Sequence, residues 1–172
     1  MSREPLAPML DLARQALANA HAPYSRFRVG ACVRSASGRL YAGCNVENAS
    51  YPVTQCAEAT AIGAMVAAGD RQIVEVVVVT EGAEPGPPCG RCRQQLAEFA
   101  SPQTRVHLCG PEGVRVTATL GELLPMPFGP GFGSLSRSLM PFANAPLSLS
   151  RGRVATTTCP GVRSPSVKRM RT

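Results

Sequence analysis

Three cysteines and one glutamate form the most chemically informative pattern in this sequence. Cys56-Ala57-Glu58 is followed, after a spacer, by Pro88-Cys89-Gly90-Arg91-Cys92. Three thiolates offer a divalent metal soft ligands and leave one coordination position for water, which distinguishes a catalytic zinc site from a closed structural one. Glu58 lies two residues from a ligand, where a carboxylate can handle the protons of that water. The pattern predicts a catalytic zinc centre.

A Cys-x-x-Cys pair alone also occurs in redox centres and in structural zinc sites. A thioredoxin-like redox role leaves Cys56 and Glu58 without a purpose. A structural zinc needs a fourth ligand, for which Cys109 is the best candidate. Measuring the metal content and the number of protein ligands would separate these two interpretations from a catalytic zinc site, which leaves one coordination position open.

The remaining cysteines indicate a reducing compartment. Seven cysteines is an odd number, and they lack the dense spacing of a disulfide scaffold. Cys32, Cys44 and Cys109 fall in apolar or strand-like surroundings, so we expect all three to be small buried hydrophobes. The chain shows no apolar run of the ~18 residues that a spanning helix needs, and its first residues do not resemble a signal peptide. We therefore expect a cytoplasmic protein without a membrane partner.

The net charge of +7 belongs to one end of the 172-residue chain. Residues 1–130 contain 11 arginines and 11 acidic residues, whereas residues 131–172 contain six arginines, one lysine and no acid. The second segment is rich in Gly, Ser, Pro and Arg and has no sustained helix or strand period, which predicts disorder. We expect one catalytic domain over residues 1–130 and a disordered basic tail over residues 131–172.

Periodicity predicts a three-layer α/β/α sandwich with a five-stranded mixed sheet. The expected helices cover residues 5–20, 56–67, 90–100 and 120–124, and the expected strands cover residues 27–33, 40–46, 73–79, 105–109 and 114–118. Cys56 and Glu58 then lie in the first turn of one helix, and Cys89 and Cys92 at the start of another. Two helix N-termini therefore converge on the metal and stabilise its thiolates.

Several polar residues outside the metal pattern also have an expected place. Asn45, Glu47 and Asn48 end a strand and form a rim where a ligand can meet donors and acceptors. His21 is expected at a helix end on the surface, and His107 as a partly exposed strand residue. Thr119 is expected to cap the last helix, with Glu122 completing a capping box.

Four segments in this order resemble the successive motifs of the small zinc-dependent cytidine deaminases. They are Tyr24 to Ala31, Asn45 to Pro52, Cys56 to Glu58, and Pro88 to Gln94. The resemblance covers roughly residues 5–130. It implies the deaminase fold, a homotetramer, and one zinc ion per subunit bound by Cys56, Cys89 and Cys92. The implied reaction is the hydrolytic deamination of cytidine and deoxycytidine in pyrimidine salvage, in which Glu58 carries the proton of the attacking water to N3 and helps to protonate the departing amine.

The same resemblance implies how a nucleoside is held. Phe27 would pack against the pyrimidine ring, although the sequence alone favours an ordinary core aromatic at this position. Asn45 and Glu47 would hold the ribose hydroxyls, and Phe128 would reach into the active site of a neighbouring subunit. The full set of implied substrate-binding residues is Phe27, Asn45, Val46, Glu47, Ala57 and Phe128.

The chain departs from the family pattern after the motif glutamate, where many members carry an arginine and this chain has Ala59. Three thiolates on a dication leave a formal charge of −1, which weakens the effect of zinc on its water. We hypothesise that Arg91 or Arg93, together with the two helix N-termini, compensates for this charge. Arg93 fits an exposed or subunit-contact position equally well.

Other activities of the same chemistry remain open at this stage. A deaminase of blasticidin S shares the zinc motifs, but Phe27 and Asn45-Val46-Glu47 favour the plain nucleoside. A polynucleotide cytosine deaminase could use the basic tail, but the neutral catalytic segment disfavours a nucleic-acid partner. An inactive scaffold is disfavoured because Glu58 and all three cysteines are present.

Overall fold

A computed structural model of the chain describes residues 5–129. Its elements are α1 (Ala7–Ala18), β1 (Val29–Ser35), β2 (Leu40–Cys44), the 3-10 turn η1 (Tyr51–Val53), α2 (Ala57–Ala67), β3 (Ile73–Thr80), α3 (Gly90–Phe99), β4 (Ala100–Gly110), β5 (Gly113–Thr119) and α4 (Leu120–Leu123). Within this range no helix is both long enough and apolar enough to cross a bilayer. The tail over residues 131–172 lies outside the described residues, so its disorder stays a prediction.

The five strands form one mixed sheet in the order β2-β1-β3-β4-β5. Strands β3 and β4 are parallel, because α3 connects them and carries the chain back along the sheet. The other neighbouring pairs are antiparallel, and β1–β2 and β4–β5 are hairpins. The predicted five-stranded mixed sheet with flanking helices is confirmed.

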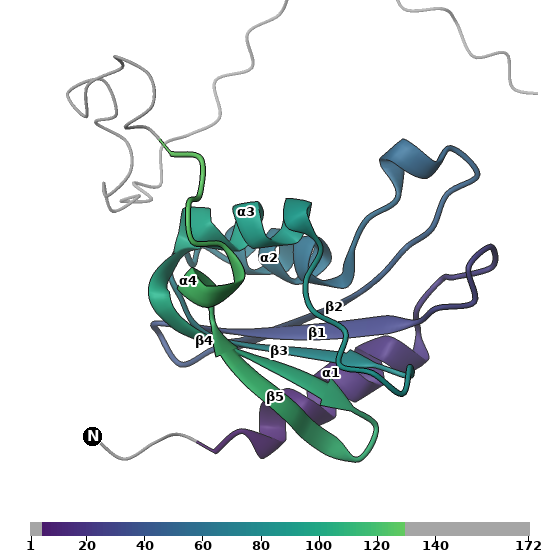
Figure 1. The fold of residues 1–172 in the computed structure, drawn as a ribbon, viewed down its shortest axis with the longest axis horizontal. Coiled ribbons are helices and arrows are strands. Elements are labelled where there is room, and N and C mark those ends of the chain that lie inside the picture. The colour runs from purple at the N-terminus through teal and green to yellow at the C-terminus, as the bar shows by residue number, and fades with distance from the viewer. Residues whose placement is uncertain (1–4, 130–172) are drawn as a thin grey trace, which may run out of the picture. The chain divides into compact units, whose positions relative to one another are not determined.

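Helices cover both faces of this sheet, which explains the apolar run in β3. Val76 and Val78 face α2 and α4 in one core cluster, whereas Val77 and Val79 face α1 in the other. Figure 1 shows α1 on one side of the sheet and α2, α3 and α4 on the other. A strand covered on both sides needs apolar residues at every position, so it loses the alternation of a half-exposed strand.

The predicted hairpin is correct, but its strands are shorter than expected at the end near the candidate site. β1 begins at Val29 and β2 ends at Cys44, so that Phe27 and Asn45 lie outside both strands. Arg26 has a φ of 57°, a left-handed conformation that turns the chain just before Phe27. The Asn45 amide still donates to the Val29 carbonyl, and the side chain of Asn45 binds the backbone of Phe27 and Val29.

Two expectations about single residues are wrong. Cys32 and Cys109 are buried as predicted, but Cys44 is only half-buried, because β2 is an edge strand. His107 was expected to be partly exposed, yet it is 4% exposed. Its ring nitrogens lie 3.2 Å from Glu75 Oε1 and 2.8 Å from Thr117 Oγ1. β4 is flanked by β3 and β5, and the local sequence does not reveal these neighbours.

Candidate active site

The sulfur atoms of Cys56, Cys89 and Cys92 form one cluster in which all lie within 4.8 Å of one another. Cys56 immediately precedes α2, and Cys89 immediately precedes α3, with Cys92 in its first turn. Neither Cys56 nor Cys89 caps its helix through its side chain, and their sulfurs lie 3.8 Å apart. Tetrahedral zinc with bonds of about 2.3 Å holds its sulfurs about 3.8 Å apart, so this donor set fits the ion.

The cysteines also influence one another electrostatically. Hydrogen bonding with Cys92 and Cys89 lowers the pKa of the Cys56 thiol to about 6, with a further contribution from the charge of Arg91. The bond to Cys56, together with burial, raises the pKa of Cys92. These hydrogen bonds therefore favour deprotonation of Cys56, and the thiolate is the form in which a cysteine binds a metal.

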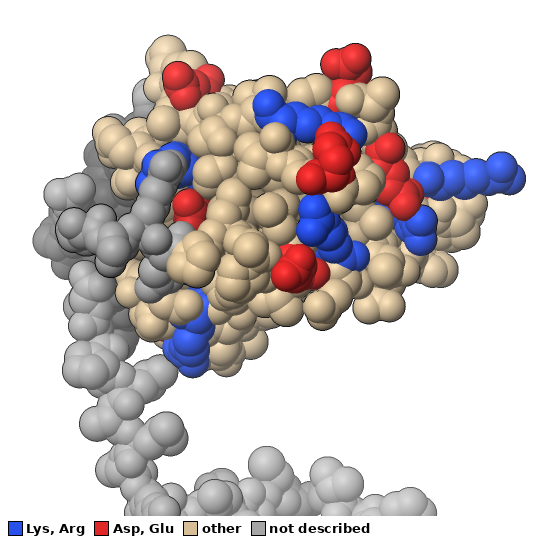
Figure 2. All heavy atoms as spheres, turned by 90° about the horizontal axis from the view of Figure 1, so that it is seen from below, with Lys and Arg blue, Asp and Glu red and all other residues tan. Residues whose placement is uncertain are grey.

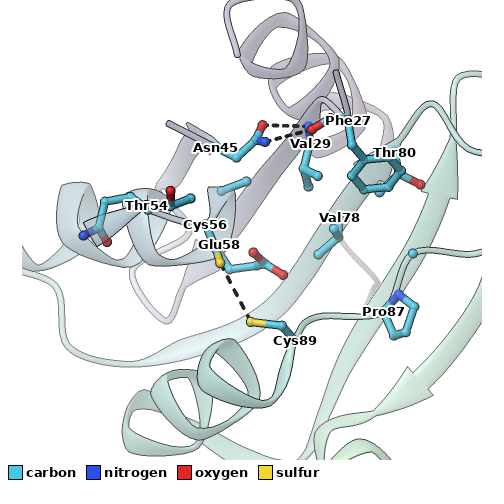
Figure 3. Close-up of a pocket in the computed structure, with 13 residues that line it drawn as sticks. Phe27, Val29, Asn45, Thr54, Cys56, Glu58, Val78, Thr80, Pro87 and Cys89 are labelled. Carbon is cyan, nitrogen blue, oxygen red and sulfur yellow. Dashed lines mark hydrogen bonds between the residues drawn. The ribbon is translucent and has the colours of Figure 1, made fainter. Parts of the chain in front are cut away.

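Glu58 lies beside the cluster, in the first turn of α2. Its side chain is buried, and Cys92 Sγ donates a hydrogen bond to Oε2 over 3.3 Å. Burial raises the pKa of this carboxyl group. Figure 3 shows the carboxyl pointing into the pocket, with Cys56 and Cys89 at the pocket wall. The arrangement places a proton-carrying group next to a metal-binding cluster.

The pocket is a cavity of about 210 Å³. Strands β1 and β3 contribute its apolar floor, the start of α2 contributes Glu58, and residues 86–89 form another wall. The lining residues are Phe27, Val29, Asn45, Thr54, Gln55, Cys56, Ala57, Glu58, Val78, Thr80, Gly86, Pro87 and Cys89. An apolar cavity with a few polar groups beside a metal site is typical of an enzyme that binds a small molecule.

Comparisons with known proteins agree with this geometry. Residues 4–108 match the family described as the cytidine and deoxycytidylate deaminase zinc-binding region. The cytidine deaminase of Halalkalibacterium halodurans is 44% identical over 120 residues, which cover 70% of this chain and 91% of that protein. The cytidine deaminase of Mycobacterium tuberculosis is 41% identical over 118 residues, covering 68% and 84%. This chain belongs to the cytidine deaminase family.

Solved structures support the same assignment. The crystal structure of cytidine deaminase from Burkholderia pseudomallei superimposes with a TM-score of 0.68 at 39% sequence identity, covering 74% of this chain and all of that one. The matched family region includes Cys56, Cys89 and Cys92, so the sulfur cluster is the zinc site of this deaminase-family chain.

Hydrogen bonds hold the backbone of Phe27, one of the residues that the family resemblance assigns to the substrate. Its backbone N–H donates to Ser25 Oγ, and its carbonyl oxygen accepts a bond of 2.9 Å from Asn45 Nδ2. Asn45 Oδ1 accepts from the Val29 amide, also over 2.9 Å. The Phe27 ring lines the cavity and is 46% exposed. Asn45 therefore fixes the backbone beneath this ring.

Glu47 belongs to a second hollow, of about 420 Å³, which shares Thr54 with the first cavity. Its carboxylate accepts hydrogen bonds from the Tyr24 amide and from both the amide and the hydroxyl of Ser25. The bond from the Ser25 hydroxyl is the main reason that the pKa of Glu47 is lowered. A charged acceptor thus lies next to the cavity that holds Glu58.

The structure gives the two candidate arginines different partners. Arg91 extends from α3 to the segment before Cys56, with bonds of 3.3 Å to the Thr54 carbonyl and 3.2 Å to Gln55 Oε1. Arg93 binds the carbonyls of Pro88 and Leu123 instead, at 2.7 and 3.0 Å. Arg91 therefore joins the two halves of the zinc site, whereas Arg93 joins the start of α3 to the end of α4.

Of the other predicted substrate residues, some line the cavity and others do not. Ala57 lines the cavity with Phe27 and Asn45, whereas Val46 and Phe128 line neither of the two hollows. Phe128 is 74% exposed, and its backbone N–H and carbonyl both bind the side-chain amide of Gln94. The structure therefore presents this ring away from the site of its own chain.

Sequence reasoning missed several residues of the cavity wall. Thr80 is the clearest case, because its hydroxyl is buried and has no hydrogen-bond partner among the described residues. Thr80 ends an apolar strand and no motif marks it. Gly86 and Pro87 could have been found, because they directly precede the Pro-Cys pair that supplies a zinc ligand.

Proposed function

We propose that this protein hydrolyses cytidine and deoxycytidine to uridine and deoxyuridine, with release of ammonia, in pyrimidine salvage. The observation that carries the proposal is the Glu58 carboxyl group, buried in a small cavity with its Oε2 3.3 Å from a sulfur of the zinc site. The relatives named cytidine deaminase support the same substrate class.

Cys56, Cys89 and Cys92 hold the zinc ion. When bound, zinc acidifies a water molecule so that a strong nucleophile is available at neutral pH. Glu58 accepts the proton of this water and delivers it to N3 of the pyrimidine. The oxygen of this water bonds to C4 as N3 takes the proton. Glu58 then carries the remaining hydroxyl proton from this oxygen to the exocyclic nitrogen. The C4–N4 bond breaks, the C4–O bond becomes a carbonyl, and ammonia leaves.

The cavity positions the base and the sugar separately. Phe27 packs against the pyrimidine, and Ala57 provides the wall beside Glu58. Asn45 and Glu47, next to the exposed Val46, face the ribose hydroxyls. Phe128 completes the site of a neighbouring subunit in a homotetramer, which its outward position supports.

The charges around the cavity favour a nucleoside over a nucleotide or a nucleic acid. Among residues 5–129, the two hollows are lined by the acidic side chains of Glu58 and Glu47 and by no arginine or lysine. A phosphate would meet these two carboxylates and no basic side chain of the described residues. The cysteines of the described residues are free, which supports residence in the reducing cytoplasm.

The test is an ultraviolet assay of zinc-loaded protein with cytidine, deoxycytidine and deoxycytidylate. We expect conversion of both nucleosides, and a kcat/KM for deoxycytidylate that is lower by about tenfold or more because its phosphate lacks a cationic partner. Faster conversion of the nucleotide would overturn the proposed substrate class. No conversion of any of the three would overturn the proposed reaction.

A further inference from the structure

The segment of residues 81–88 connects β3 to α3 and forms a wall of the cavity through Gly86 and Pro87. It leads directly to Cys89. In the described part of the chain, no turn or loop hydrogen bond joins the backbone of residues 82–88 to another backbone group. Apart from the fixed φ angles of Pro85, Pro87 and Pro88, the hydrogen bonds that hold the path of this segment within the described residues come from side chains.

Three arginines supply these contacts. Arg28 pairs with the Glu81 side chain at the start of the segment, and Arg93 binds the Pro88 carbonyl at its end. Arg115 binds the middle, because its guanidinium donates to the carbonyl of Gly82 and, over 3.2 Å, to that of Glu84. Among residues 5–129, Arg115 alone holds the backbone between the two ends in this way.

Arg115 is itself held in one position. It lies in β5, its side chain is 19% exposed, and Glu112 binds two of its nitrogens. Gly110, on the facing end of β4, lies directly against the guanidinium. A Cβ atom at position 110 would lie 2.2 Å from the nearest nitrogen of Arg115. The glycine therefore leaves the space that the guanidinium occupies.

We propose that Arg115, seated against Gly110, is a positioning residue that fixes the 81–88 segment and with it the cavity wall formed by Gly86 and Pro87. Hydrogen bonds from a guanidinium to backbone carbonyls are charge-assisted, and two of them on one segment define its orientation. Arg115 lines neither hollow and acts only through the segment. The identity of the ligand that meets this wall rests on the proposed function, but the positioning does not.

The test is ¹⁵N relaxation of the 81–88 segment in zinc-loaded protein, carried through a double-mutant cycle. We expect Arg115→Ala to lower the backbone order parameters of Gly82, Ala83 and Glu84 from about 0.85 to below about 0.6, because the segment loses its two carbonyl contacts. Gly110→Ala should have a similar effect, because the added methyl displaces the guanidinium. In the Arg115→Ala background, Gly110→Ala should add nothing, since there is no guanidinium left to displace.

Arg105→Ala is the matched control. It removes the same charge from the other end of the β4–β5 hairpin and should leave the order parameters of the segment unchanged. Arg115→Lys, which keeps the charge but not the two-carbonyl geometry, should give intermediate order parameters and provides a milder variant if Arg115→Ala does not fold.

Unchanged order parameters in both Arg115 variants would overturn the proposal, as would full additivity of Gly110→Ala and Arg115→Ala. In an active enzyme, Arg115→Ala should also raise KM for cytidine more than it lowers kcat. Lowered order parameters in a protein that deaminates no nucleoside would refute the proposed function and leave the positioning role intact.

Discussion

The proposed proton transfer depends on the position of single side chains, above all Glu58 and Cys92. A carboxyl group with little exposure is kept beside three sulfurs, one of which is only 3.3 Å away. Burial of a carboxyl group costs free energy, which the weak hydrogen bond from the Cys92 thiol offsets only in part. The position of Glu58 is therefore better explained by proton transfer than by stability.

Arg91 is the side chain that most directly ties the two halves of the zinc site together. Its bonds to Thr54 and Gln55 cross from α3 to the residues just before Cys56. We predict that Arg91→Gln speeds zinc transfer to a chromophoric chelator by about tenfold, because groups around a metal site hold its ligands in place.

Arg71→Gln is the matched control for this measurement. Arg71 binds carbonyls at the far end of α2, so its loss removes the same charge without touching the zinc site. Equal zinc-release rates in Arg91→Gln, Arg71→Gln and the parent protein would show that Arg91 does not support the site.

At the scale of elements, the start of α2 is placed by its close approach to β2. A Cβ atom at Gly43 would lie 2.5 Å from the Ala61 amide nitrogen and 2.7 Å from the Ala57 carbonyl oxygen. These are backbone atoms, so Gly43→Ala must push the whole helix away. We predict that it lowers the free energy of unfolding by about 1–3 kcal/mol, measured by urea denaturation.

Substitution of a second glycine is the control, and we expect it to change stability in the opposite direction. Gly63 is exposed within α2, and a Cβ there would meet nothing within 4 Å. Gly63→Ala should raise stability by about 0.5–1 kcal/mol through helix propensity. A Gly43→Ala protein as stable as Gly63→Ala would show that α2 is free to move.

Helices and strands could be predicted from the sequence because their periodicity depends on nearby residues. Contacts that depend on the order of strands in the sheet could not be predicted. The apolar run of β3 and the spacing of Cys56, Glu58, Cys89 and Cys92 are visible in the sequence because each depends on neighbouring residues. The burial of His107 depends on β3 and β5 as flanking strands. The contact of Arg115 with Gly82 likewise joins residues that only the folded sheet brings together.

The whole molecule carries its charge unevenly. Figure 2 shows basic and acidic side chains interspersed over the described face, and pairs such as Arg28–Glu81, Arg39–Asp70 and Arg115–Glu112 account for much of this balance. The excess of +7 comes from residues 131–172. Residues 1–130 therefore have a formal net charge of zero without the tail.

Deletion of residues 131–172 tests the proposed division into a catalytic domain and a tail. We predict unchanged kcat/KM for cytidine and unchanged assembly, because the described core contains both cavities and the zinc cluster. Sedimentation velocity and the nucleoside assay measure these two properties. Loss of assembly or of activity in the shortened protein would contradict the division.

Stability should depend on pH through Asp70, which joins the β1–β2 hairpin to the end of α2. Its carboxylate binds Arg39 at 2.7 Å and the hydroxyls of Ser37 and Tyr41 at 2.8 Å. The bonds from Arg39, with those from the nearby hydroxyls, hold the pKa of Asp70 below its usual range. Because the pKa of Asp70 is lower in the folded state, its ionised carboxylate stabilises the folded protein at pH values above the unfolded-state pKa of about 4. This stabilisation is lost as pH falls towards the folded-state pKa.

Asp70→Asn should therefore be less stable than the parent protein at pH 7, and the difference should narrow as pH falls below about 4. Urea denaturation at a series of pH values measures this. A difference that stays constant across the series would mean that the charge of Asp70 does not contribute.

Glu58 is proposed to carry protons beside a three-cysteine zinc site, and Glu58→Gln removes this ability. The measurement is the turnover of cytidine by this variant at equal zinc content, since the amide keeps the size of the side chain but cannot accept the proton. We predict full zinc occupancy with turnover lower by about 10²–10⁴-fold. Turnover close to that of the parent protein, with zinc bound, would show that Glu58 does not carry the proton.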